Sequence, residues 1–222
     1  AGREITIDSN NVNVDNLTLA TRAASTALQS RGWNVVINGS IVNEYSMSFN
    51  GTDEYVEFSP ITFTGDLTVS AWVKTTDTEA VVVGGAGGDG GANSNLIYIG
   101  DDVVYFMSGN GSYAALTFDA SVNNDQWNHI VIVKQTGSNV VGYLNGAAQS
   151  GVSYSGVLGD TTAVKYLGRR EGGENFTSEM DEVSLWNSAL DADAVTAVYN
   201  SGQPINLSKA KGNYDNEGDL VS

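Results

Sequence analysis

Residues 127–146 read Trp-Asn-His-Ile-Val-Ile-Val-Lys-Gln-Thr-Gly-Ser-Asn-Val-Val-Gly-Tyr-Leu-Asn-Gly, and they predict two neighbouring β-strands. Apolar, mostly β-branched residues dominate 127–134 and 140–144, and a polar segment separates the two runs. Asn145-Gly146 then carries the strongest hairpin signal of the chain, because both central positions of a type I′ turn need a positive φ. The stretch therefore indicates a fold of short strands joined by tight turns.

The same pattern continues on both sides of this stretch. Runs rich in Val, Ile, Phe, Tyr and Thr recur about every ten residues, with Gly, Asn and Asp between them, which is typical of a sandwich or jelly roll. One late helix is predicted over 192–199, with Asp191 as its N-cap and Ser201-Gly202 at its end. The predicted strands are 46–49, 55–58, 67–74, 80–83, 96–99, 103–107, 114–118, 127–134, 140–144, 163–167 and 180–186.

Residues 1–42 predict a different unit, a small strand-helix-strand extension. A unit of this size cannot bury its own apolar face, so we expect it to pack on a neighbour. Its segments Leu17-Thr-Leu-Ala-Thr and Leu28-Gln-Ser-Arg-Gly-Trp-Asn-Val resemble the last unit of the leucine-rich-type repeats that precede lectin domains in phage and bacterial surface proteins. That resemblance implies a repeat-like cap or a docking element. Strands are expected over 4–7 and 33–37, and a helix over 17–31 between an N-cap at Asp15 or Asn16 and a C′ residue at Gly32.

The other two parts of the chain are a sandwich over 43–203 and a polar tail over 204–222. The tail closes on Leu220-Val221-Ser222, which looks like the start of a further strand. We therefore expect the natural polypeptide to continue.

Composition excludes several classes of function. The 222 residues are 41% hydrophobic, with 26 Gly and only 2 Pro, which suits one sandwich and argues against disorder. A net charge of −16 argues against binding to nucleic acid, and no apolar run reaches the roughly 18 residues of a membrane helix. The absence of cysteine excludes disulfides and thiolate metal sites, and it favours a bacterial or viral source.

Four stretches together resemble the bacterial and viral laminin-G-like, or concanavalin-A-like, lectin family. They are Ser48-Phe-Asn-Gly-Thr-Asp-Glu-Tyr-Val-Glu-Phe58, Leu67-Thr-Val-Ser-Ala-Trp-Val-Lys74, Trp127-Asn-His-Ile-Val-Ile-Val133 with Gly142-Tyr-Leu-Asn-Gly146, and Glu179-Met-Asp-Glu-Val-Ser-Leu-Trp-Asn-Ser-Ala-Leu190. Their order and spacing hold over about 45–202. The resemblance implies an all-β, two-sheet antiparallel jelly-roll sandwich. Trp72, Trp127 and Trp186 are then predicted to lie in the core between the sheets.

The same class of fold includes glucanases, so the enzyme hypothesis needs a test. Those glycosidases share an E-x-D-x-E strand that sets two carboxylates on one face. Glu179 and Asp181 match the first two positions, but Val183 occupies the third, and Glu182 is expected on the opposite face. A catalytic triad would need His129, the single histidine, which is predicted to be buried. The sequence therefore predicts that the protein is not an enzyme.

A calcium ion is the cofactor that the resemblance implies. In this family a structural ion lies near the aspartate of the closing strand and the glycine of the opening hairpin. Those positions are Asp181 and Gly51, with Asp53 nearby. The alternative is that Asp181 caps a strand or pairs with Arg169 or Arg170.

A sugar site would need an aromatic platform and planar polar groups, on loops at one end of the sandwich or across a sheet. The glycine-rich loop around Asp89 is a further candidate for a ligand or ion. The candidate ligand-binding residues are Asp89, Asn95, Tyr113, Tyr154, Arg169 and Arg170, with Tyr98 and Tyr105 as further aromatic groups.

Taken together, the sequence predicts a non-enzymatic glycan-binding or adhesion domain displayed by a larger assembly. The expected setting is a phage virion, as a tail fibre, capsid protrusion or decoration, or else a cell surface. Expected partners are surface glycans and other subunits of the assembly in a homo-oligomeric display. Two alternatives stay open: a purely structural module that binds no sugar, and an inactive or divergent glucanase relative.

Overall fold

The computed structural model describes residues 3–8, 33–38, 46–85, 94–101, 103–137, 139–202, 204 and 219–221. The chain divides into two compact units, Ala1–Asn43 and Glu44–Ser222. No helix in these ranges is long and apolar enough to cross a membrane.

The first unit contains two paired strands. β1 (Arg3–Asp8) and β2 (Trp33–Asn38) run parallel, in a register that begins with Arg3 opposite Trp33. These are the two strands that were expected over 4–7 and 33–37. The helix expected over 17–31 lies outside the described residues.

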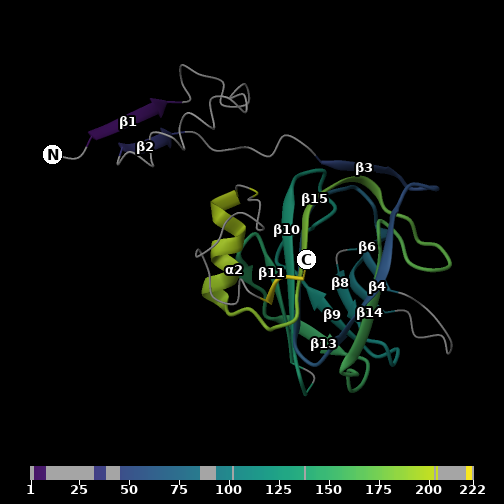
Figure 1. The fold of residues 1–222 in the computed structure, drawn as a ribbon. Helices are drawn as coiled ribbons and strands as arrows, with labels where there is room; N and C mark the ends of the chain where they lie inside the picture. The colour runs from purple at the N-terminus through teal and green to yellow at the C-terminus, as the bar shows by residue number, and fades with distance from the viewer. Residues whose placement is uncertain are drawn as a thin grey trace. The chain divides into compact units, whose positions relative to one another are not determined.

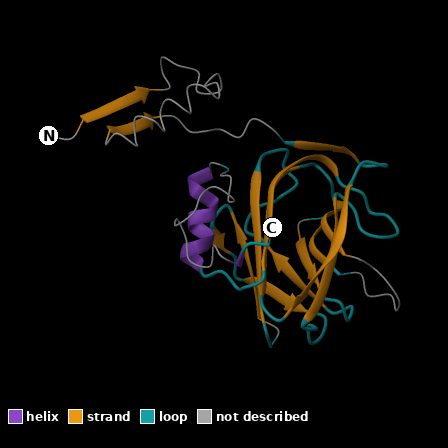
Figure 2. Ribbon diagram, viewed as in Figure 1, coloured by secondary structure: helices purple, strands orange, loops and turns teal. Residues whose placement is uncertain are grey.

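The second unit is a sandwich of two antiparallel sheets, which confirms the predicted fold class (Figures 1 and 2). The six-stranded sheet has the order β12 (Ala147–Ala148), β11 (Asn139–Leu144), β10 (Asn128–Gln135), β5 (Leu67–Lys74), β15 (Thr177–Trp186) and β3 (Met47–Asn50). The seven-stranded sheet has the order β13 (Gly151–Tyr154), β9 (Tyr113–Thr117), β8 (Val103–Met107), β7 (Asn95–Gly100), β6 (Glu79–Gly85), β14 (Thr161–Leu167) and β4 (Val56–Thr64).

All eleven predicted sandwich strands are present; those over 67–74 and 103–107 have the predicted bounds, and the ends of the others are shifted. β4 runs through Pro60, which is tolerated because β4 is the edge strand of its sheet. β12 and β13 were not predicted, because both are short, largely exposed and without apolar alternation. At the C-terminal end, Leu220 forms an antiparallel bridge with Trp186, so the apolar pair at 220–221 adds to the end of β15.

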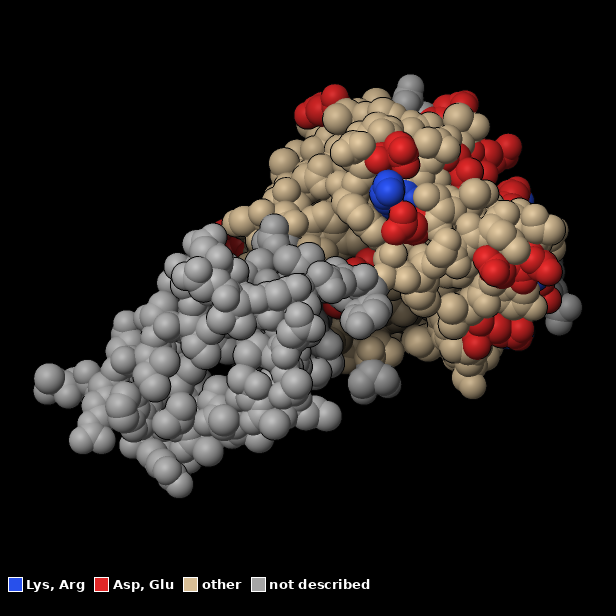
Figure 3. Space-filling view, turned by 90° about the horizontal axis from the view of Figure 1, so that it is seen from above, with Lys and Arg blue, Asp and Glu red and all other residues tan. Residues whose placement is uncertain are grey.

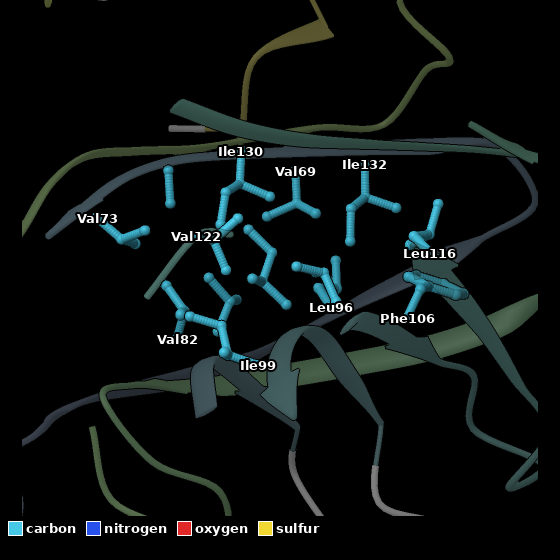
Figure 4. Close-up of a cluster of buried hydrophobic side chains, with 14 of the residues drawn as sticks. Val69, Val73, Val82, Leu96, Ile99, Phe106, Leu116, Val122, Ile130 and Ile132 are labelled. Carbon is cyan, nitrogen blue, oxygen red and sulfur yellow. The ribbon is translucent and has the colours of Figure 1, made fainter. Parts of the chain in front are cut away.

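The core lies between the sheets. On β5, the side chains of Leu67, Val69, Ala71 and Val73 point inward and are fully buried. Figure 4 shows the two layers meeting, with Val69, Ile130 and Ile132 from the six-stranded sheet and Leu96, Phe106 and Leu116 from the seven-stranded sheet.

A second apolar cluster lies on the outer face of the six-stranded sheet, under α2 (Ala192–Tyr199) (Figure 1). The Asp191 carboxylate accepts the Ala194 N–H at 2.8 Å as the predicted N-cap, and the helix ends at Asn200 in the left-handed region. Val195 and Val198 of α2 are buried in this cluster.

The structure corrects the prediction for the tryptophans. Trp72 and Trp186 are buried, but they lie on this outer face against α2 and not between the sheets. Trp72 alternates with the inward residues of β5 and stacks on Tyr199, while Trp186 belongs to the cluster under α2. Trp127 precedes β10 and is 38% exposed. An apolar strand sequence thus predicts that a side chain is buried, but not whether it is buried between the sheets or under the helix.

The predicted Asn145-Gly146 turn is confirmed. It joins β11 to β12 with φ of 51° at Asn145 and 80° at Gly146. A Cβ atom at Gly146 would lie 2.7 Å from the Tyr199 ring, so glycine is needed here for contact with α2 as well as for the turn.

Candidate functional site

A row of tyrosines crosses the outer face of the seven-stranded sheet. Ile99 and Val104 lie in the inter-sheet core, so strand alternation turns their neighbours Tyr98 and Tyr105 outward. These two tyrosines are directly opposite each other in the β7–β8 register, with ring centroids 5.6 Å apart. Tyr113 on β9 continues the row at 5.6 Å from Tyr105, edge to face. Three strands thus present one continuous aromatic surface.

Local geometry holds Tyr98 and Tyr105 in place within this row. The Tyr98 hydroxyl donates a hydrogen bond to Glu79 Oε1 at 2.8 Å. Burial, and then this hydrogen bond, raise the pKa of Tyr98 well above its ordinary value, so the hydroxyl stays a neutral donor. A Cβ atom at Gly100 would lie 2.8 Å from the Tyr105 ring and 3.2 Å from the Tyr98 ring. Glycine therefore lets both rings lie close against the backbone.

The loop after β14 extends this surface across β6. The Gly168 N–H donates to the Val82 carbonyl at 3.0 Å. A Cβ atom built at Gly84 would lie only 1.9 Å from the Arg169 carbonyl oxygen. The loop backbone therefore crosses β6 so closely that only glycine fits beneath it.

An ion pair in this loop meets the tyrosine row. Arg170 Nη2 contacts Glu174 Oε1, and both groups act electrostatically on Tyr98. Burial raises the pKa of Glu174, and the neighbouring Glu79 carboxylate raises it further, while Arg170 opposes the shift. Planar donors and acceptors thus lie beside the aromatic rings.

Arg169 and two further tyrosines complete the surface. The Arg169 guanidinium carbon is 4.4 Å from the Tyr55 ring centroid and 5.2 Å from the Tyr166 centroid. The two rings meet edge to face at 5.9 Å. We call this surface the tyrosine face; it comprises Tyr55, Glu79, Tyr98, Tyr105, Tyr113, Tyr166, Arg169, Arg170 and Glu174.

The structure divides the predicted ligand residues among several places. Tyr113, Arg169 and Arg170 lie on the tyrosine face. Tyr154 pairs with the inward-facing Ala114, and its hydroxyl accepts the Val140 N–H of the other sheet at 3.0 Å, so it closes an edge of the sandwich. Asn95 is fully buried, and within the described ranges its Oδ1 has no hydrogen-bond partner. Asp89 lies outside the described residues.

Sequence reasoning missed Tyr55, Tyr166, Glu79 and Glu174. A bulge in β14 between Val164 and Tyr166 explains one of these omissions. Simple alternation would point Tyr166 to the same side as Val164, into the core, whereas the extra residue turns it outward. Bulges have no reliable sequence signal, so this part of the face is visible only in the structure.

The three predicted calcium ligands do not converge. Gly51 and Asp53 belong to the turn after β3, where a Cβ atom at Gly51 would meet the Thr177 side chain. Asp181 lies four residues beyond Thr177 on β15. At the rise of an extended strand, this places Asp181 roughly 13 Å from Thr177 and therefore from the turn that holds Gly51. Groups of three or more histidine or acidic side chains that could hold a metal do not occur among residues the structure describes. These positions therefore do not fit a single calcium site, and calcium binding by this chain stays a prediction.

The glucanase-like positions do not form an acid–base pair. Glu179 and Asp181 both face outward on β15, opposite Lys74 and Trp72. Hydrogen bonds from Ser46 at 2.9 Å and from Lys74 at 3.1 Å lower the pKa of Glu179, which is the wrong direction for a general acid.

The third position of the glucanase motif, where those enzymes have a carboxylate, is held by Val183. Val183 packs against the inter-sheet core. A bulge between Asp181 and Ser184 interrupts the strand alternation at Glu182, whose φ is 42°.

His129 is buried as predicted and is part of the packing under α2. Its ring stacks on Trp72 at 5.0 Å and on Tyr199 at 5.8 Å, and its Nε2 lies 2.9 Å from the Ser70 hydroxyl. Burial lowers the pKa of His129 to about 4, so the ring is neutral at pH 7.

Comparison with known proteins agrees with this architecture. Residues 50–196 match the model of the concanavalin A-like lectin/glucanases superfamily, and the chain belongs to that superfamily. Similar solved structures include domain 4 of AbnA, a GH43 extracellular arabinanase from Geobacillus stearothermophilus, with 18% identity, coverage of 72% of this chain and 82% of that one, and a TM-score of 0.52. A heptameric SAP-like pentraxin from Limulus polyphemus has 16% identity, coverage of 69% and 81%, and a TM-score of 0.49. No curated protein matches the sequence.

Proposed function

We propose that the sandwich is a non-catalytic glycan-binding domain and that the tyrosine face is its binding surface. The observation that carries this proposal is the row of three tyrosines in contact on one side of the sheet, with the Tyr55–Tyr166 pair held against Arg169 and with Glu79, Arg170 and Glu174 beside the row. Helix α2, the only α-helix in the described part of the chain, lies on the other sheet.

The chemistry of this surface suits a saccharide. One face of a sugar ring presents C–H groups that pack on aromatic rings, while its hydroxyls need planar donors and acceptors. The tyrosine row offers the first kind of contact, and the carboxylates with Arg170 offer the second. Tyr98, Tyr105 and Tyr113 lie on adjacent strands, so the row spans roughly 10 Å, the length of a short oligosaccharide and not of a single sugar.

Two further observations support the proposal. The structure of the similar arabinanase domain is a complex with arabinotriose, so a domain of this fold accommodates an oligosaccharide. The place of Val183 in the core, where the glucanase motif has its third carboxylate, argues against glycoside hydrolysis on the other sheet.

The wider setting that we propose is display on a virion or another extracellular surface, in several copies. The net charge of −16 suits a soluble appendage, and the leucine-rich-like segment near the N-terminus resembles units that precede lectin domains. Repeated copies would add avidity to a shallow site of modest affinity.

A glycan array with the purified chain tests the function. We expect binding to a restricted set of oligosaccharides, and Tyr105→Ala should weaken that binding about tenfold, because it removes the central ring of the row. Tyr154→Ala is the matched control, since it removes an exposed tyrosine from outside the tyrosine face. Unchanged affinity in Tyr105→Ala would contradict the location. Absence of binding to every glycan would favour the purely structural module.

A further inference from the structure

In the described part of the sandwich, four of the five basic side chains form an ion pair with a carboxylate, and one does not. Residues 46–202 contain five lysines and arginines. Among the described residues, Arg169 alone of these has no ion pair with a carboxylate. The pairs are Lys74–Glu179, Lys134–Asp160, Lys165–Glu57 and Arg170–Glu174.

This unpaired guanidinium is held in a fixed position. Tyr55 and Tyr166 both contact it, and Arg169 Nε donates a hydrogen bond to the Arg170 carbonyl at 3.0 Å. The donors that remain are the two terminal amino groups, which form the planar fork that matches a carboxylate. Because the side chain is already ordered, a ligand would pay little entropy to use it.

The surrounding charges make this arrangement unusual. The protein carries 26 acidic residues against 10 basic ones, and the coloured part of the face drawn in Figure 3 shows several acidic side chains with few basic ones among them. Two carboxylates of neighbouring segments pair with other cations, Glu57 with Lys165 at 2.7 Å and Glu174 with Arg170. Among the residues that the structure describes, no carboxylate pairs with Arg169, which is therefore available to an anion.

We propose that the glycan bound on the tyrosine face carries a carboxylate, as a uronic or sialic acid does, and that Arg169 binds this group. The inference rests on the proposed function, since it assigns a sugar class to the same surface. A planar carboxylate fits the guanidinium fork in a bidentate manner. A densely sulfated polymer fits less well, because the net charge of −16 repels a polyanion at long range.

The test compares saccharides that differ only in the carboxylate. The probes are trigalacturonate against its carboxyl-reduced trisaccharide, and sialyllactose against lactose, with a heparin tetrasaccharide as the sulfated probe. Titration calorimetry should show at least one carboxylated probe binding about tenfold more tightly than its neutral partner, as expected for one charge-assisted contact. High salt should reduce this preference.

Three variants separate the role of Arg169 from its packing. Arg169→Gln should bind acidic and neutral partners equally, whereas Lys74→Gln, which removes a cation from the other sheet, should keep the preference. Arg169→Lys keeps the charge over the rings but loses the fork, so it should keep only part of the preference. If Arg169→Gln does not fold, the salt dependence of the wild type and the Arg169→Lys variant still decide the question.

The outcomes distinguish this inference from the proposed function. Equal wild-type binding to acidic and neutral partners, with loss in Tyr105→Ala, would overturn the carboxylate contact and leave glycan binding intact. A preference for carboxylates that persists in Arg169→Gln would overturn the assignment of Arg169, and tighter binding of heparin would overturn the sugar class. Failure of every acidic and neutral probe, together with a blank glycan array, would overturn both proposals.

Discussion

The two outer faces of the sandwich are built from the same kind of strand and end up with opposite properties. On the six-stranded sheet, α2 covers Trp72, His129 and Trp186, and all three are buried. On the seven-stranded sheet, the tyrosine row keeps partial exposure, with Tyr113 at 37%. The difference lies in what covers the sheet after the strands have formed.

That difference separates stability from binding. Rings under α2 are stacked on one another and contribute through the removal of apolar area from water. Rings on the tyrosine face meet mostly tilted or edge to face, and they keep charged groups beside them. We therefore expect substitutions on the covered face to change the free energy of unfolding, and substitutions on the tyrosine face to change affinity.

The largest change in the free energy of unfolding is expected from a substitution on the face that α2 covers. Trp186→Ala should lower the free energy of unfolding by about 3 to 5 kcal/mol, because it leaves a large cavity beneath α2. Urea unfolding measures this loss. Trp127→Ala is the matched control, and its exposed ring should cost about 1 kcal/mol or less. Equal losses in the two variants would mean that α2 does not seal this face.

A pH titration sharpens the same comparison. His129 has a folded pKa of about 4 against 6.5 for an ordinary histidine, so the unfolded chain binds more protons between these values. The stabilisation that comes from burying the neutral His129 ring is complete above pH 6.5. Roughly 3 kcal/mol of the free energy of unfolding should be lost as the pH falls to 4. Urea unfolding of the wild type and of His129→Gln at several pH values isolates the contribution of His129. Between pH 4 and 6.5, the free energy of unfolding should change less steeply with pH in the variant than in the wild type. An unchanged slope would place the titration on other groups.

The smallest expected effect on stability is on the tyrosine face. Tyr113→Ser should change the free energy of unfolding by about 0.5 kcal/mol, because the ring is part-exposed and lies at the end of the row. Urea unfolding beside glycan titration should then show weaker binding at nearly constant stability. A loss of several kcal/mol would show that the tyrosine face is a packing surface.

Particular residues show how far sequence reasoning reached. The Asn145-Gly146 turn and the Asp191 cap were predicted because each depends on the conformation or hydrogen bonding of a few adjacent residues. Tyr113, Arg169 and Arg170 were predicted from their chemistry, and the structure places all three on the tyrosine face. Tyr154 has the same chemistry, but the register of β13 gives it a different role.

The sequence by itself determined the fold class, the strand order along the chain, the late helix and the burial of His129. These follow from alternation, turn residues and apolar runs, which are local properties of the polypeptide. Tertiary structure alone decided that Trp72 and Trp186 lie under α2, that the bulge in β14 turns Tyr166 outward, and that no carboxylate of the described residues pairs with Arg169. The physical reason is that layer, register and ion pairing depend on contacts between segments far apart in the chain, and these exist only when the two sheets and α2 have packed.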